Sequence, residues 1–158
     1  MFDLIIRGDQ VVTPQGTGAW DICINGETIA AIAAPGTFDD SQGVKVIDTT
    51  GKIVIPGGID PHIHSLWHIP PMEEGGEVSW TDGPDVVSKA AIHGGTTTLL
   101  DFANWQQSGT IEEVINVRKQ DWTGNCYTDY GYHIMLQGAI PPEILPQIGE
   151  AIQEGYPS

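Results

Sequence analysis

The pattern of apolar and polar residues changes near Pro56 and divides the chain into two parts. Before that point short apolar runs alternate with turn residues, as in DLIIRGDQVVTP and WDICINGETIAAIA, and no helical period is visible. Asn25-Gly26 predicts a hairpin between two such runs, because this pair tolerates positive φ. Gly8-Asp9 predicts a break in the first run, and residues 44–56 predict two more short strands.

After Pro56 the pattern alternates between strands and helices. Pro84 in a first turn and a Gly94-Gly95 stop mark one helix, and a Thr110/Glu113 capping box opens the next. Pro146 is expected to interrupt the last helix. The segment 65–83 reads as a loop. The predicted strands are 57–64, 96–103 and 126–136, and the predicted helices are 84–95, 109–122 and 141–155.

This β-α-β-α-β-α order predicts parallel strands joined by crossover helices. A closed barrel of this type needs eight units and about 250 residues. The chain has three units and stops after a helix, where another strand is expected. We therefore expect the N-terminal part of a longer protein, with residues 1–55 in one domain and residues 56–158 in an incomplete second one.

The composition excludes some classes of binding partner. Six basic against 21 acidic residues give a net charge of -15, which disfavours nucleic acid and anionic membrane surfaces. Cys23 and Cys126 lie far apart and form no metal-binding or redox motif, as expected in a reducing compartment. Neither a signal peptide nor an apolar span is visible, so the expected location is the cytoplasm.

His62 and His64 are the strongest candidates for chemistry. Residues two apart in a strand point to one side, and α/β folds place their sites at the ends of parallel strands. Two neutral imidazoles there would supply half of a tetrahedral metal site, and Asp60 follows the same alternation. An isolated His-x-His pair is also found solvated or satisfied by local hydrogen bonds, so the motif alone leaves both interpretations open.

Three segments carry a family resemblance. PGGIDPHIH is typical of the amidohydrolase superfamily, and GGTTTLLDFA and DYGYHIML favour one group within it. Along essentially all its length the chain resembles the dihydropyrimidinase and hydantoinase group of cyclic amidohydrolases.

The resemblance implies a (β/α)8 TIM-like barrel, of which this chain holds the first three units, preceded by part of a small β-sandwich domain. It implies two divalent metal ions, zinc being expected, with His62 and His64 among their ligands. A carbamylated lysine, the remaining ligands and the general base would lie beyond Ser158, so no catalytic residue is expected within this chain. A metal-bridged hydroxide would open a small cyclic amide, namely a hydantoin, dihydropyrimidine or cyclic imide. Members of the group usually form tetramers.

Four further residues are candidates for pocket or supporting groups. The loop after His64 lacks an arginine, so a carboxylated ring is not expected, and Trp67 either lines a pocket or packs on the barrel rim. Asp101 is expected at a strand end, where it either supports a ligand histidine or caps a loop. Asn104 and Trp105 follow it and are expected to border the pocket.

The other histidines favour structural roles. His68 reads as an ordinary loop residue, His93 as a helix-terminal cation, and His133 as a satisfied core group. Rival functions are a single-metal heterocycle deaminase of the same superfamily and a dihydropyrimidinase-like scaffold without catalysis. A third alternative is that the 158 residues act alone as a small open-sheet domain.

Overall fold

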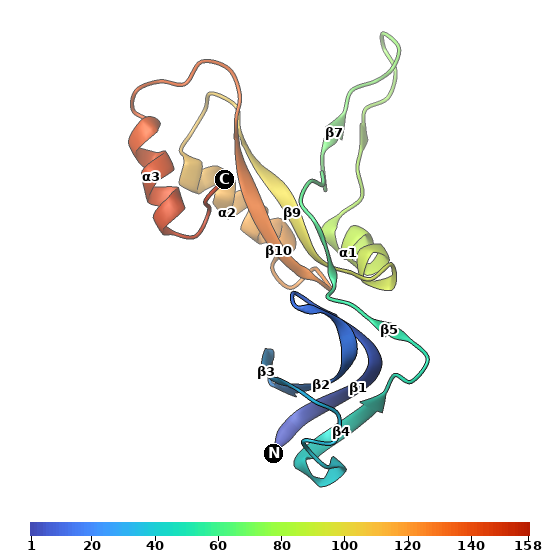
Figure 1. Ribbon diagram of the computed structural model, residues 1–158. Helices are drawn as coiled ribbons and strands as arrows, with labels where there is room; N and C mark the ends of the chain where they lie inside the picture. Colours follow the sequence, from blue (N-terminus) through green and yellow to red (C-terminus); the bar gives the residue numbers. More distant parts are fainter. The chain divides into compact units, whose positions relative to one another are not determined.

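A computed structural model describes residues 1–158, which is the whole chain. The chain forms two compact units, Met1–Pro56 and Gly57–Ser158, each with its own main sheet. Strands and helices are both present, so the fold is mixed α/β (Figure 1). None of the helices is long and apolar enough to cross a membrane.

The first unit is a five-stranded sheet in the order β3-β2-β1-β4, with β5 also paired to β1. Strands β1 to β3 are antiparallel, whereas β4 and β5 run parallel to β1. The predicted hairpin is confirmed: Gly26 has φ 57° in the turn between β2 and β3. The strands are β1 Phe2–Thr13, β2 Gly16–Asn25, β3 Thr28–Ala33, β4 Gly43–Asp48 and β5 Ile53–Val54.

The predicted break at Gly8-Asp9 is wrong, because β1 continues through it with a register shift between Gly8 and Val11. Such a bulge inserts residues without ending the strand. A Cβ atom at Gly8 would lie 2.6 Å from Val11 Cγ2 and 2.9 Å from Thr49 Oγ1. The glycine therefore accommodates the close approach of Val11 from the same strand and of Thr49, which follows β4.

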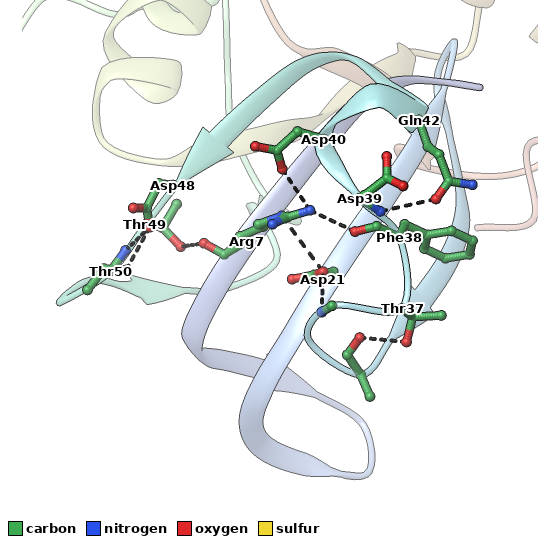
Figure 2. Close-up of polar contacts among 12 residues, drawn as sticks. Arg7, Asp21, Thr37, Phe38, Asp39, Asp40, Gln42, Asp48, Thr49 and Thr50 are labelled. Carbon is green, nitrogen blue, oxygen red and sulfur yellow. Dashed lines mark hydrogen bonds and ion pairs between the residues drawn. The ribbon is translucent and has the colours of Figure 1, made fainter.

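The side chain of Arg7 in β1 contacts the segment that connects β3 and β4 (Figure 2). Its Nη2 atom donates to the carbonyl oxygen of Phe38 at 2.7 Å and lies 2.9 Å from Asp40 Oδ1. The buried carboxylate of Asp21 lies 3.9 Å from Arg7 Nε and accepts a hydrogen bond from Gly36 N. The short 3-10 helix Asp40–Gln42 lies in this connection.

The second unit contains a parallel sheet in the order β10-β9-β6. The predicted alternation of strands and helices is confirmed. The segment predicted as a plain loop contains a short antiparallel hairpin, which projects away from the sheet in Figure 1. The elements are β6 Gly58–Asp60, β7 His68–Ile69, β8 Ser79–Trp80, α1 Pro84–His93, β9 Thr96–Trp105, α2 Ile111–Trp122, β10 Asp129–Leu136 and α3 Leu145–Gln153.

Two helix starts follow the predicted signals. Helix α1 begins at Pro84, and α2 begins with a capping box in which Thr110 Oγ1 accepts from Glu113 N and Glu113 Oε2 accepts from Thr110 N. The expected interruption of the third helix is wrong. Helix α3 starts at Leu145, so Pro146 lies in its first turn, where a missing N–H breaks no helical bond.

The core of the second unit lies on one face of its sheet. Alternate residues of β9 are buried there, with Leu99, Asp101, Ala103 and Trp105 each at most 2% exposed. The same core takes side chains from all three helices: Val87 and Ala91 of α1, Ile111, Ile115 and Trp122 of α2, and Ile148 and Ala151 of α3. The helices therefore cover one face, and the opposite face remains free of helices.

Candidate metal centre

The helix-free face of the sheet carries a group of aromatic rings. Phe102 lies on this face of β9, and its partner in the register of β10 is His133. Because paired residues of neighbouring strands project to the same side, the two rings lie together, with centroids 5.1 Å apart. His62 and His64 reach the same group from the end of β6.

The backbone after β6 explains how the two histidines reach this face. The predicted strand 57–64 is shorter than expected, since β6 ends at Asp60 and Pro61 follows. Pairing with β9 resumes once, where Ile63 N donates to Leu100 O at 3.0 Å. The Ile63 side chain packs against the helix-covered core, and its two neighbours therefore project to the other side.

The predicted convergence of the two imidazoles is present. The Nε2 atoms of His62 and His64 lie 3.2 Å apart, and the ring centroids are 4.9 Å apart. Zinc–nitrogen bonds of 2.0–2.1 Å at a tetrahedral angle place two ligand nitrogens about 3.3 Å from each other. The observed separation therefore fits two ligands of one metal ion, although an N–H···N hydrogen bond between neutral rings has a similar length.

The rest of a metal shell is not found in this chain. No group of three or more His, Cys, Asp or Glu side chains is positioned to hold a metal. Asp60 was expected to share the alternation of the histidines, but its Oδ1 atom instead accepts a hydrogen bond from His62 N at 3.2 Å. The carboxylate thus stabilises the turn that leads into the pair.

Trp67 packs on the imidazole ring of His64, and the two ring centroids are 4.2 Å apart. Its position depends on Leu66, which has φ 51°, a left-handed conformation that is uncommon for residues other than glycine. Two hydrogen bonds hold the next residue: Trp67 N donates to Thr81 Oγ1, and Thr81 N donates to Trp67 O. The strained turn is thus fixed by the base of the hairpin.

Trp67 and Asn104 both line a cavity of about 410 Å³, whose other walls include residues of α2 and Gln137 after β10. The expectation that these two residues border a substrate pocket stays a prediction. The Trp67 Nε1 and Asn104 Oδ1 atoms are buried and have no hydrogen-bond partner.

Asp101 does not lie where it was expected. Strand β9 extends to Trp105, so Asp101 is inside the strand, and its side chain points into the helix-covered core. Its Oδ2 atom accepts from Trp122 Nε1 at 3.0 Å and lies 3.7 Å from Arg118 Nη1, while Oδ1 accepts from Phe102 N. It therefore supports neither a ligand histidine nor a loop.

Trp105 also lies elsewhere than expected. It is 1% exposed on the helix-covered face, and its Nε1 atom donates to Gly109 O at 3.0 Å, so it does not border the pocket. The two-residue period of β9 places Asp101 and Trp105 on one face and Phe102 and Asn104 on the other.

Phe102 also contacts the histidine pair, although no sequence motif singles it out. Its ring lies 4.6 Å from that of His62 and 5.0 Å from that of His64, by centroids. The alternation of 99–105 separates Phe102 from Asp101, but it does not tell which of the two faces the helices cover.

The other three histidines are engaged in other contacts. His133 makes two hydrogen bonds, with Pro61 O at 2.9 Å and Ser158 Oγ at 2.7 Å, so it is satisfied as expected but on the open face and outside the helix-covered core. His93 is bonded to Lys89 O within α1, and His68 packs on Trp80 in the hairpin.

The chain is similar to enzymes of one group. It is 35% identical to the D-hydantoinase of Streptomyces coelicolor over 156 residues, 98% of this chain and 32% of that enzyme. It is 31% identical to the dihydropyrimidinase of Rattus norvegicus, covering 84% of this chain and 25% of that enzyme. The crystal structure of dihydropyrimidinase from Brevibacillus agri superposes with a TM-score of 0.78 at 33% identity, covering 94% of this chain and 30% of that one.

The chain thus spans about a third of the length of the relatives it matches. No family model matches it. The matched region contains both units, the open face with its histidine pair, and the hairpin.

Proposed function

Because this chain belongs to the group of D-hydantoinases and dihydropyrimidinases and matches their N-terminal third, we propose that the protein that carries it hydrolyses a cyclic amide. The expected substrates are hydantoins, dihydropyrimidines and cyclic imides, which open to N-carbamoyl amino acids or half-amides. The supporting observation within the chain is the convergence of His62 and His64 at 3.2 Å.

In this proposal His62 and His64 bind a divalent metal ion through their Nε2 atoms, and zinc is the expected ion. The donor set fits, because neutral imidazole is a common zinc ligand and the separation matches a shared ion. A bound divalent metal supplies a water of lowered pKa and polarises a carbonyl oxygen. A second metal, a carbamylated lysine, the general base and further ligands would come from a region that the relatives have and this chain does not cover.

The barrel is part of the same proposal. In a (β/α)8 barrel the helices form an outer ring and the chemistry lies at the C-terminal ends of the strands. Here all three helices pack on one face of a parallel sheet, and the histidine pair lies at the C-terminal end of β6 on the other face. The three strands would form one arc of the barrel, and the sheet of residues 1–56 would form part of the β-sandwich.

The chain's own residues have definable roles in such a site. His62 and His64 hold the metal on the open face. Trp67 and Asn104 line the adjacent cavity, where an apolar ring and an amide would contact the ring substrate. Their Nε1 and Oδ1 atoms are buried and have no hydrogen-bond partner in the chain.

A metal analysis combined with substitutions tests the proposal. In the full polypeptide that carries this chain, His62→Ala and His64→Ala should each reduce bound zinc to a small fraction of the parent value and abolish ring opening of hydantoin, dihydrouracil and succinimide. His93→Ala is the matched control, because His93 is an exposed histidine at the end of α1 and lines neither the histidine pair nor the cavity beside Trp67. It should retain the metal and at least most of the activity.

The rival functions give different results in the same experiment. A non-catalytic scaffold would contain less than about one metal per subunit and open no ring. A deaminase would release ammonia from an amino-substituted heterocycle and leave cyclic amides intact. The tetramer and the cytoplasmic location expected from the sequence belong to the proposal too, and the tetramer can be tested by light scattering.

A further inference from the structure

Phe102 lies close to four other aromatic rings on the open face. Its centroid lies 4.6 Å from that of His62, 5.0 Å from that of His64, 5.1 Å from that of His133 and 6.4 Å from that of Trp67. It belongs to β9, the central strand of the sheet, and its backbone N–H is bonded to the buried carboxylate of Asp101. The ring therefore stands on a well-anchored part of the unit.

His133 connects the two outer strands across Phe102. The sheet order is β10-β9-β6, yet His133 of β10 reaches the carbonyl oxygen of Pro61, which directly precedes His62 after β6. A carbonyl oxygen only accepts hydrogen bonds, so His133 Nε2 must carry the proton and donate it. In the neutral ring Nδ1 then accepts from the Ser158 hydroxyl at 2.7 Å. The two bonds define both the tautomer and the orientation of His133.

We propose that Phe102 and His133 are positioning residues that set the separation of the His62 and His64 Nε2 atoms for metal binding. The Phe102 ring packs against both imidazoles and limits their rotation. His133 holds the backbone at Pro61 through its hydrogen bond to the carbonyl oxygen. The inference rests on the proposed metal site. Neither residue is assigned to the metal itself, since one has no ligand atom and the other has both ring nitrogens engaged.

This arrangement matters because the two histidines have few other restraints. Both imidazoles are exposed, and β6 has already ended before them. Pairs of exposed side chains lose rotamer freedom when they bind one ion, so a framework that restricts them beforehand raises the affinity. Supporting groups around metal ligands typically change metal affinity by about 10–100-fold when they are mutated.

The test is a zinc titration against a competing chelator, carried out on the metal-free full polypeptide that carries this chain. Phe102→Leu removes the ring but retains an apolar side chain, and His133→Ala removes the bond to Pro61. Each should weaken zinc binding by about tenfold or more. Phe102→Tyr keeps the ring and His133→Gln keeps a side-chain N–H donor, so both should restore affinity to within about threefold of the parent.

Leu100→Ala is the matched control. Leu100 precedes Phe102 on the same face of β9, and its side chain lies against Gly131. This variant should lower the melting temperature and leave zinc affinity unchanged, which separates positioning from general loss of packing. Wild-type zinc affinity in both Phe102→Leu and His133→Ala would overturn the inference. If His62→Ala and His64→Ala also bound zinc normally, the proposed metal site itself would be wrong.

Discussion

The two faces of β9 differ in how their polar groups are satisfied. On the helix-covered face Asp101 is completely buried, and its carboxylate meets the indole N–H of Trp122, the guanidinium of Arg118 and a backbone amide. On the open face Asn104 has a buried Oδ1 atom without a partner, and the two imidazoles of the pair contact mainly each other and aromatic rings.

This difference separates folding from function within one strand. Removing one partner of a buried, paired charge strongly destabilises the folded protein. A buried polar atom without a partner has lost its water without gaining a hydrogen bond, so removing it need not destabilise the fold. Substitutions on the helix-covered face should therefore reduce stability, whereas a substitution at Asn104 on the open face should change binding first.

The largest expected effect is on the helix-covered face. Asp101→Ala should lower the free energy of unfolding by about 3–5 kcal/mol, because it leaves Arg118 and Trp122 without their buried acceptor. Urea denaturation followed by tryptophan fluorescence measures it. Asp121→Ala is the control, since Asp121 pairs with the same arginine from a more exposed position. A loss below about 1 kcal/mol for Asp101→Ala would contradict the contrast between the faces.

Tyr132 should make the same face sensitive to alkali. Burial, with smaller contributions from Tyr130, Tyr156 and Asp101, raises the pKa of the Tyr132 hydroxyl above its ordinary value of about 10. Above pH 10 the unfolded state loses this proton while the folded state retains it, so unfolding becomes more favourable. The free energy of unfolding should fall by up to about 1.4 kcal/mol per pH unit above pH 10.

Tyr132→Phe isolates this contribution from the other groups that titrate in alkali. Its unfolding free energy should decline less steeply than that of the parent between pH 9 and pH 11 in otherwise identical urea titrations. Parallel pH profiles for the two proteins would mean that Tyr132 does not titrate differently in the two states.

A smaller effect is expected where α2 begins beside this core. Thr110→Ala removes the side-chain acceptor for Glu113 N and should destabilise the protein by about 1 kcal/mol. Thr110→Ser retains the hydroxyl and should remain within about 0.5 kcal/mol of the parent. Equal melting curves for both variants would show that the capping box contributes little here.

The smallest change should come from the open face and have the opposite sign. Asn104→Leu replaces an unpaired buried amide oxygen by an apolar group of similar size and should be neutral or stabilising by less than about 1 kcal/mol. The same variant should impair ligand binding if the cavity beside Trp67 receives the ring. Substantial destabilisation would show that Asn104 has a structural partner.

Local chemistry made much of the fold predictable. The Asn25-Gly26 hairpin, the capping box at Thr110 and the Pro84 start of α1 appear as expected because each depends on residues only a few positions apart. Errors occurred where a local signal had more than one structural solution. Gly8 allows a bulge as well as a break, and Pro146 suits a first turn as well as a kink.

The site was predictable in part for the same reason. The spacing of His62 and His64 indicated a convergent pair, and the structure brings their nitrogens together. The assignment of Asp101 and Trp105 to the pocket failed because a two-residue alternation identifies two faces but not which of them is covered. That choice depends on where α1, α2 and α3 pack, which is a property of distant segments.

By itself the sequence determined the order of strands and helices, the break near Pro56, the histidine pair and the likeness to cyclic amidohydrolases, since these depend on near neighbours and motifs. Only the tertiary structure decided which face of β9 is covered, that Phe102 lies beneath both imidazoles, and that His133 reaches Pro61 from 72 positions away. Such contacts arise from packing between separate strands, and no local pattern encodes them.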